Sequence, residues 1–256
     1  MNSTRIGILG TGNYAWHLFQ CLAENKQSVA VHYARNIASF QGFPSNEQGI
    51  QTQDLEDLSS CSILFLCVSD SAVKKLSEHW KGKDQLVVHV SGGLSLDSLK
   101  SDRKGVFYIP QSFSKYRPVS YNGLPVCIES NQTEDEKTLL NLASLLNLKA
   151  HLLNSDQRRR LHLAAVMTNN FSNYLLIQSE NWMTQHDIDP SILHPLILET
   201  AKKAIDLGPK NAQTGPAIRG DMGTVKKHLR LIKNMKLKSL YRRLTRDIFE
   251  SREKKL

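Results

Sequence analysis

Three small residues near the N-terminus have the types and spacing of a phosphate-binding turn. In the segment RIGILGTGNYAWHLFQ, Gly10, Gly12 and Ala15 follow a short apolar run and open a stretch with apolar residues at helical spacing. Gly10 permits a tight turn, Gly12 has no side chain to block a pyrophosphate, and Ala15 lets the helix pack closely on the strand. The free N–H groups at the head of the helix would then face the phosphates. The pattern favours a dinucleotide site over an ordinary strand–turn–helix connection, and we expect it to comprise Gly10, Thr11, Gly12, Asn13, Tyr14 and Ala15.

The end of the next strand-like segment, residues 28–33, indicates which dinucleotide this turn would bind. NAD-binding proteins usually place Asp or Glu about 20 residues after the turn, where it binds the ribose 2′-hydroxyl. Here the chain reads HYARN, without a carboxylate. The planar guanidinium of Arg35 suits a 2′-phosphate. We therefore predict NADP as the cofactor, with Arg35 at its 2′-phosphate; a surface arginine after a strand is the alternative.

Small polar residues follow two further apolar runs. The sequences CVSD, ending at Asp70, and VSGG, ending at Gly93, each close a strand-like segment. Ligands of open parallel sheets bind outside the carboxyl ends of the strands. We therefore add Ser69, Asp70 and Ser91 to the predicted cofactor-binding residues, with ordinary loop chemistry as a nearly equal alternative.

The elements that must position these residues alternate along the first half of the chain. Apolar or alternating runs predict strands at residues 5–9, 28–33, 62–68, 85–90, 105–109 and 124–129, and helical patterns lie at residues 71–79 and 134–146. After residue 153 only helical patterns remain: from Asp156 to about residue 185 with Ser155 as N-cap, at residues 188–207, and from Asp221 to about residue 251, broken at most once. The expected fold is α/β: a Rossmann-type, mostly parallel sheet domain at residues 1–154, followed by an all-α domain at residues 155–256.

Composition limits the classes of function. The chain is 40% hydrophobic, and no apolar run is long enough to cross a bilayer or to form a secretory signal. Its four cysteines are widely spaced and contain no C-x-x-C pair, which favours reduced, buried thiols and a cytoplasmic location. Residues 226–256 hold 12 Lys and Arg against 3 Asp and Glu, and the remaining 21 basic and 21 acidic residues cancel. This pattern favours a solvated helix over a nucleic-acid partner.

Several longer stretches resemble one family. They are GILGTGNYAWHL, HYARN, FLCVSDSAV, VVHVSGG, YIPQSFSK, SDQRRRLHLAAVMTNNFSNYLL, LILETAKKA and AQTGPAIRGD. The chain resembles Rossmann-like NADP oxidoreductases with a C-terminal domain of unknown function, in the 6-phosphogluconate dehydrogenase-like superfamily. The resemblance implies an NADP-binding domain, a helical second domain, homodimerisation through it, and an active-site cleft between the two domains. It implies no particular substrate.

The same resemblance directs attention to the helix that begins near Asp156. Related dehydrogenases carry a Lys-x-x-Asn-Asn pattern there, in which the lysine acts as acid or base. Aligning the asparagines on Asn169 and Asn170 places Val166 at the position of the lysine. His162, Asn169 and Asn173 would share a helical stripe with Val166, at spacings of 4, 7 and 11 residues from His162.

His162 is the available proton donor of this stripe, because its ordinary pKa lies near neutrality. The alternatives are a histidine packed at a domain junction and, for Asn169, an amide bonded across the domain interface. The loop that holds Gln111, Ser112 and Ser114 could supply hydrogen bonds to a substrate. Arg219 could pair with a substrate carboxylate, with Asp221 or with a second copy of the chain. We therefore expect His162, Asn169 and Ser112 to be the catalytic residues.

These residues support two hypotheses about function. The first is an NADP-dependent oxidoreductase that transfers hydride between nicotinamide and a small carbonyl, imine or alcohol bound between the domains. The second is a non-catalytic NADP-binding sensor, which the valine in place of lysine motivates. No H-x-x-x-H pair or G-x-S-x-G turn occurs, so neither hypothesis includes a metal or a serine nucleophile.

Overall fold

The first part of the chain forms one eight-stranded sheet in the order β3-β2-β1-β4-β5-β6-β7-β8. The computed structural model describes residues 4–43 and 49–253. The strands are β1 (Ile6–Leu9), β2 (Val29–Tyr33), β3 (Ile50–Thr52), β4 (Ile63–Leu66), β5 (Leu86–His89), β6 (Lys104–Tyr108), β7 (Pro125–Ser130) and β8 (Lys149–Leu152). All neighbouring pairs are parallel except β6 and β7, which are antiparallel. The chain order reverses beside β1, which is the point where such sheets bind ligands.

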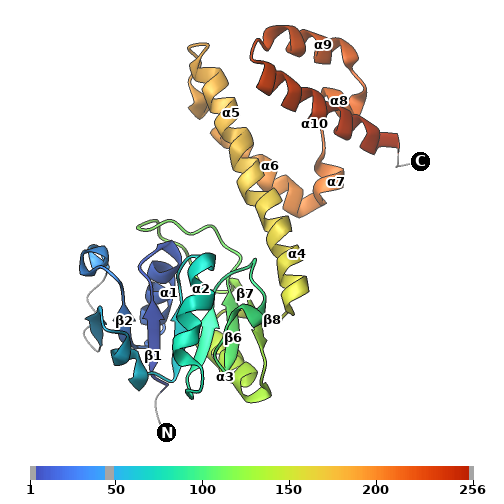
Figure 1. Cartoon of the computed structure of the whole chain (residues 1–256). Helices are drawn as coiled ribbons and strands as arrows, with labels where there is room; N and C mark the ends of the chain where they lie inside the picture. The colour runs from blue at the N-terminus through green and yellow to red at the C-terminus, as the bar shows by residue number, and fades with distance from the viewer. Residues whose placement is uncertain (1–3, 44–48, 254–256) are drawn as a thin grey trace. The chain divides into compact units, whose positions relative to one another are not determined.

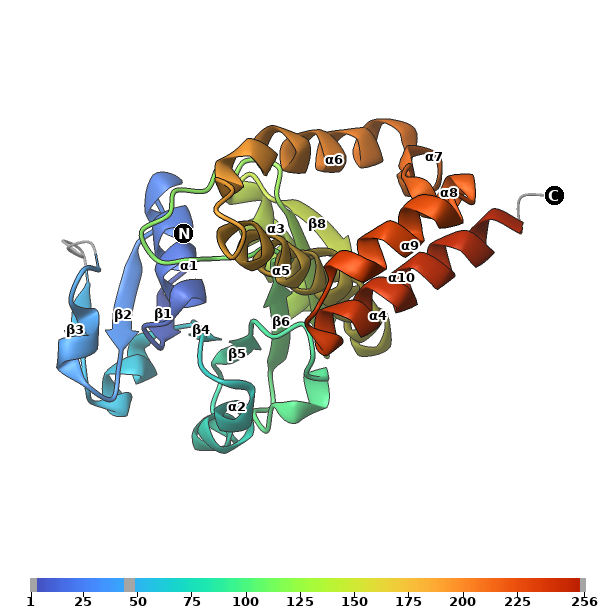
Figure 2. The ribbon, with the colours of Figure 1, turned by 90° about the horizontal axis from the view of Figure 1, so that it is seen from above.

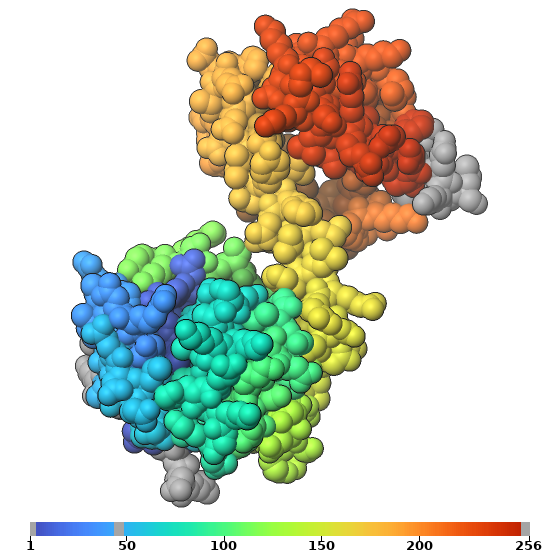
Figure 3. All heavy atoms as spheres, viewed as in Figure 1, coloured from blue at the N-terminus to red at the C-terminus, as the bar shows by residue number. Residues whose placement is uncertain are grey.

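Helices cover both faces of the sheet (Figure 1). On one face, α1 (Asn13–Glu24) and α3 (Thr133–Leu145) contribute apolar side chains to a core that includes Ile8, Phe65 and Phe107. On the other face, α2 (Asp70–Ser77) and the short 3₁₀ helices after β3 and α2 pack over Leu64 and Val87. The space-filling view shows the residues around α2 at the surface of this part of the chain (Figure 3). The central strands are buried on both sides, which explains their continuous apolar runs.

The predicted strands and helices of this part are confirmed, and the sheet contains two further strands. The sequence patterns did not predict β3 or β8, both of which lie at edges of the sheet. All four residues of β8 are exposed, and in β3 only Thr52 is partly buried. Because neither strand contributes a buried face, neither has the apolar alternation by which a strand is recognised.

The rest of the described chain is helical. Its elements are α4 (Ser155–Ala165), a π-helical segment (Val166–Phe171), α5 (Ser172–Thr184), a 3₁₀ turn (Pro190–Leu193), α6 (His194–Leu207), α7 (Pro209–Ala212), α8 (Pro216–Arg219), α9 (Met222–Leu231) and α10 (Met235–Glu253). Helices α9 and α10 lie side by side (Figures 1 and 2). The expected Rossmann-type α/β domain followed by an all-α domain is therefore confirmed.

Two predicted details of the helices are wrong. The N-cap of α4 is Asn154, not Ser155: Asn154 accepts a hydrogen bond from the N–H of Gln157, and the Gln157 side chain accepts one from the N–H of Asn154. Ser155 is already helical, and its hydroxyl bonds to Glu129. The helix is also not a regular α-helix throughout, because residues 166–171 form π-turns. A π-turn adds a residue, so Asn173 is rotated out of the stripe that regular spacing from His162 predicted.

The contacts divide the chain into two compact units, one up to Asn170 and one from Phe171. The last strand ends at Leu152, but the first unit extends beyond it to Asn170. This unit therefore includes α4 and most of the π-helical segment as well as the sheet. The predicted domain boundary near residue 154 remains a prediction.

Within the described ranges, no helix is both long and apolar enough to span a membrane. The four cysteines are buried and free: Cys21, Cys61, Cys67 and Cys127.

Candidate functional site

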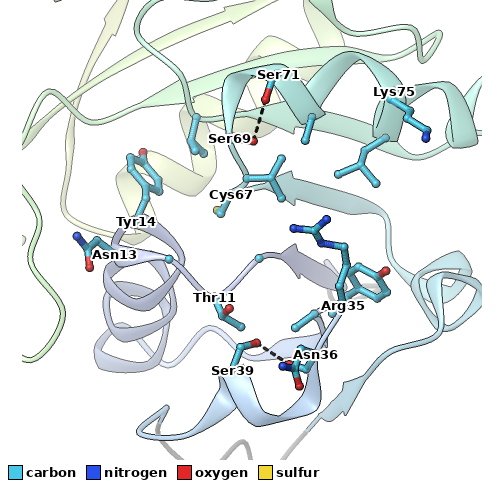
Figure 4. A pocket seen from close by; sticks show the side chains of 18 residues that line it. Thr11, Asn13, Tyr14, Arg35, Asn36, Ser39, Cys67, Ser69, Ser71 and Lys75 are labelled. Atoms are coloured by element: carbon cyan, nitrogen blue, oxygen red, sulfur yellow. Dashed lines mark hydrogen bonds between the residues drawn. The ribbon is translucent and has the colours of Figure 1, made fainter.

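A cavity of about 950 Å³ lies at the carboxyl ends of β1, β2 and β4. Figure 4 shows side chains from the glycine turn, from the end of β2 and from α2 around it. Seven of its lining residues belong to the predicted cofactor site: Gly10, Thr11, Gly12, Asn13, Tyr14, Arg35 and Ser69. The structure therefore brings together residues that are up to 59 positions apart in sequence.

The two glycines of the turn have different physical roles. Gly10 has φ of +112°, and a Cβ there would lie 2.2 Å from the carbonyl oxygen of Cys67. Its N–H donates to the carbonyl oxygen of Tyr33 at 2.9 Å, which joins the turn to the end of β2. At Gly12, in contrast, a Cβ would meet nothing within 4 Å and would project into open space. Gly10 is thus required by the close approach of two strand ends, whereas Gly12 leaves room for a ligand.

Gly12 is also the N-cap of α1, and no side chain caps the helix there. The first N–H groups of α1 therefore have no side-chain acceptor and meet the cavity with the positive end of the helix dipole. Ala15 does not line the cavity; it is fully buried and packs in the core beneath the turn. Ala15 serves the site by letting α1 approach the sheet.

Asn13 and Tyr14 connect the turn to the loop after β6. The Tyr14 hydroxyl donates to the carbonyl oxygen of Phe107 at 2.8 Å and accepts from the N–H of Ile109 at 3.1 Å. The side-chain oxygen of Asn13 accepts from the N–H of Lys115 at 3.2 Å. Both residues line the cavity, and both hold neighbouring backbone in place.

At the end of β2, Arg35 lines the cavity together with Asn36 and Ser39. The Ser39 hydroxyl donates to the carbonyl oxygen of Asn36 at 2.6 Å, and the backbone oxygen of Arg35 accepts from the Gln53 amide at 2.8 Å. Among the residues in the ranges 4–43 and 49–253, no Asp or Glu lines the cavity. Lys75, on α2, adds a second cation that sequence reasoning did not predict. The lining is therefore suited to an anionic ligand.

Asp70 and Ser91 lie beside the cavity without lining it. The Ser91 hydroxyl donates to the Asp70 carboxylate at 3.1 Å and accepts from the N–H groups of Gly93 and Leu94. Ser69 is in the lining, and its hydroxyl is 3.2 Å from that of Ser71. The Asp70–Ser91 pair joins the end of β4 to the end of β5.

A second group of residues surrounds Gly92, at the end of β5. The hydroxyl of Tyr108, the last residue of β6, is 3.3 Å from Nδ1 of His162 on α4. A Cβ at Gly92 would lie 2.7 Å from both His162 Nδ1 and Tyr108 Cζ, so only glycine leaves room for this pair. Burial raises the pKa of Tyr108, which keeps its hydroxyl protonated. Sequence reasoning identified His162 but missed Tyr108, whose position at the carboxyl end of a strand was the available signal.

A buried ion pair holds α4 in place one turn before His162. Arg158 is fully buried; its guanidinium pairs with Glu129 on β7 and donates to the carbonyl oxygen of Leu94. Ser155 also donates to Glu129 and accepts from the N–H of Leu96 at 2.9 Å. These bonds connect α4 to β7 and to the loop that contains Gly92, so they set the position of His162.

The other predicted catalytic residues are less constrained. Asn169 is exposed in the π-helical segment. Ser112 is exposed in the loop after β6, where its N–H donates to the Gln111 side chain at 2.8 Å. Neither side chain makes a hydrogen bond to the described residues that would hold it beside His162. Arg219 ends α8 in the second unit, where Asp221 caps α9 through the N–H of Thr224.

Two buried histidines support the strand ends around the cavity. His32 Nε2 is 2.7 Å from the carbonyl oxygen of Gly10, to which it donates. Burial lowers its pKa to about 4. His89 Nδ1 accepts from the N–H of Ser91 at 3.2 Å; burial, assisted by the charge of Arg158, lowers the pKa of His89 to about 3. Both rings are therefore neutral at pH 7, and each forms a hydrogen bond with a backbone group at the end of a strand.

Comparison with known proteins agrees with this geometry. Residues 5–93 match the family described as NADP oxidoreductase, coenzyme F420-dependent, and residues 124–248 match a domain of unknown function, DUF2520. A solved structure from Bacteroides fragilis, assigned as a candidate NADP oxidoreductase, is 33% identical, covers 97% of this chain and 98% of its own, and has a TM-score of 0.87. The chain belongs to this family of NADP oxidoreductases. No curated protein matches its sequence.

More distant structures share the fold of this NADP oxidoreductase. Pyrroline carboxylate reductase of Plasmodium falciparum, solved with NADP bound, is 12% identical over 99% of this chain and 98% of its own, with a TM-score of 0.61. A reductive aminase from Aspergillus terreus, solved with NADPH, is 11% identical over 96% of this chain and 95% of its own, with a TM-score of 0.64. The predicted cofactor, NADP, is confirmed by the match to the NADP oxidoreductase family and by the 33% identical relative from Bacteroides fragilis.

The residues of the cavity fit NADP. The open space at Gly12 and the free N–H groups of α1 suit its pyrophosphate, and the cationic end of the cavity suits a further phosphate. When bound, the nicotinamide of NADP would supply the hydride-transfer chemistry, and the protein would orient the substrate.

Proposed function

We propose that this NADP oxidoreductase transfers hydride between nicotinamide and a small carbonyl, imine or alcohol. The observation that carries the proposal is the Tyr108–His162 pair beside Gly92, in the same unit as the dinucleotide cavity. A reductase of this kind needs a proton donor near the cofactor, because hydride addition to a carbonyl or imine leaves negative charge on the oxygen or the nitrogen, which then takes up a proton.

His162 is the proposed proton donor. In the imidazolium, Nδ1–H donates to the Tyr108 hydroxyl oxygen, and Nε2–H is the proton passed to the substrate. Nε2 makes no hydrogen bond to the described residues, so it is available for this transfer. After the transfer, His162 remains as the neutral tautomer with its proton on Nδ1, still held by Tyr108. Asn169 and Ser112 would position the substrate.

Turnover measurements test this role. Purified protein and NADPH are mixed with a panel of small ketoacids, aldehydes and cyclic imines, and absorbance of NADPH is followed. His162→Ala should lower kcat by about 100-fold or more, the range of general acid–base catalysis, and leave the Kd for NADPH unchanged. His151→Ala, at an exposed histidine of the same unit, is the matched control. Unchanged turnover in His162→Ala would refute the role of His162.

A non-catalytic NADP-binding sensor is the second candidate, and Val166 favours it. Val166 stands where related dehydrogenases have a lysine, and it opens the π-helical segment. A sensor requires tight NADPH binding with no turnover over the whole panel. Turnover of any member at a useful rate, lost in His162→Ala, would exclude the sensor.

We also propose that the second unit mediates homodimerisation. No residue of α6 is buried within the chain, and Leu198 and Ile205, seven residues apart on one face, are 74% and 82% exposed. Apolar side chains on one helical face are typical of an interface. Sedimentation velocity should show a dimer that Ile205→Glu converts to monomer, whereas Lys203→Glu, on the opposite face of α6, should not. A wild-type monomer would refute the proposal.

A further inference from the structure

The cavity has a cationic end formed by two elements that are distant in sequence. Arg35 follows β2, and Lys75 lies in the second turn of α2. Figure 4 shows their side chains on opposite walls of the same end of the cavity. Neither side chain forms an ion pair with any residue in the described ranges 4–43 and 49–253. Two like charges that face one space, without a protein counter-charge, favour an anion between them.

The position of the glycine turn indicates which part of the cofactor would lie at the cationic end of the cavity. The pyrophosphate of a dinucleotide lies at the head of α1, beside Gly12, and the adenosine ribose extends from it toward the end of β2. The 2′-phosphate of NADP is attached to that ribose and carries a charge of about −1.5 to −2 at neutral pH, as phosphate monoesters do. The anion that can reach both Arg35 and Lys75 is therefore the 2′-phosphate.

We propose that Lys75 is a second specificity-determining residue, which binds the 2′-phosphate of NADP from the α2 side while Arg35 binds it from the β2 side. The two contributions differ in kind. The guanidinium of Arg35 offers a planar pair of donors, whereas the ammonium of Lys75 acts as a point charge on a flexible chain. The backbone around Arg35 is held by Gln53 and by the Asn36–Ser39 hydrogen bond, so Arg35 provides the fixed part of the site and Lys75 the adaptable part.

The adjacent lysine provides a matched control. Lys74 is an exposed residue of the same helix, with the same charge, but it does not line the cavity. Substitution of either lysine by methionine removes one positive charge and retains most of the aliphatic stem. A general effect of charge on anion binding would appear in both variants, whereas a specific contact with the 2′-phosphate would appear only in Lys75→Met.

The experiment measures binding and requires no substrate, so its outcome is independent of the proposed reaction. Dissociation constants for NADPH and NADH are measured by fluorescence, and those for 2′,5′-ADP and 5′-AMP by calorimetry. Lys75→Met should raise the Kd for NADPH and for 2′,5′-ADP about tenfold or more, the effect of one charge-assisted hydrogen bond. The Kd values for NADH and 5′-AMP should change less than twofold, and Lys74→Met should resemble the wild type.

Two results would overturn the proposal. One is an equal loss of affinity for NADPH and NADH in Lys75→Met. That result would mean that Lys75 contacts a group present in both cofactors, and not the 2′-phosphate. The other is unchanged affinity for all four ligands. Thermal melting of the unliganded variant shows whether it is folded, and Lys75→Arg, which retains the charge, should keep most of the preference for NADPH.

Discussion

Two buried histidines should make the folded protein lose stability as the pH falls from 7 to 5. The side chains of His32 and His89 have exposed fractions of 0%. Their pKa values in the folded protein are about 4 and about 3, against an ordinary value of 6.5. His32 donates to the carbonyl oxygen of Gly10, which lines the cavity, and His89 accepts from the N–H of Ser91 at the end of β5. Protonation of either ring would thus affect the backbone that forms the site.

The sign and size of the effect follow from proton linkage. In the unfolded chain both histidines bind a proton as the pH falls through 6.5, whereas in the folded protein they stay neutral until about pH 4 and pH 3. The unfolded state therefore binds more protons in this window, and the free energy of unfolding decreases as the pH decreases. Between pH 7 and pH 5 each histidine should contribute a loss of about 2 kcal/mol. Together they would remove about 4 kcal/mol from a typical 5–15 kcal/mol.

Urea unfolding at pH 7 and pH 5 measures this loss, with tryptophan fluorescence as the signal, since Trp16 and Trp80 both lie in the first unit. His32→Gln retains a donor near Nε2, and His89→Asn retains an acceptor near Nδ1, but neither amide titrates. Each variant should therefore lose about 2 kcal/mol less than the wild type on acidification. His151→Gln, at an exposed position, should behave as the wild type. If both variants keep the full wild-type pH dependence, the reasoning is refuted.

Three further substitutions test other parts of the site. Gly92→Ala would place a Cβ 2.7 Å from His162 Nδ1, so it should lower kcat at least about tenfold with little change in the Kd for NADPH; equal kcat would contradict the tight packing. Glu129→Gln leaves Arg158 buried without its counter-charge and should lower the free energy of unfolding by about 3–5 kcal/mol in urea titrations. In Gly12→Val the new side chain would project into the space for the pyrophosphate, so NADPH binding should weaken at least about 100-fold in calorimetry. The melting temperature should stay within a few degrees, because no protein atom lies within 4 Å of the added Cβ. A large drop in melting temperature would show that Gly12 serves folding instead.

Local patterns in the amino-acid sequence were sufficient to predict the main fold and the cofactor, and seven of the residues proposed to bind that cofactor line one cavity. The glycine turn, the apolar strand beneath it and the arginine after the second strand all lie within the first 35 residues, where spacing along the chain determines spacing in the structure. The buried strands could be predicted because a strand covered on both faces must be apolar throughout. The edge strands β3 and β8 could not, since their exposed residues carry no such requirement.

Tertiary structure alone decided which distant side chains meet. Gly92, Tyr108 and His162 come from the ends of β5 and β6 and from α4, and their contact depends on the order of the strands and on the Glu129–Arg158 pair that holds α4. Lys75 reaches the cavity opposite Arg35 only because β1 and β4 are neighbours in the sheet. Periodicity describes one element at a time, whereas these contacts arise between elements whose arrangement is set by burial of the whole core.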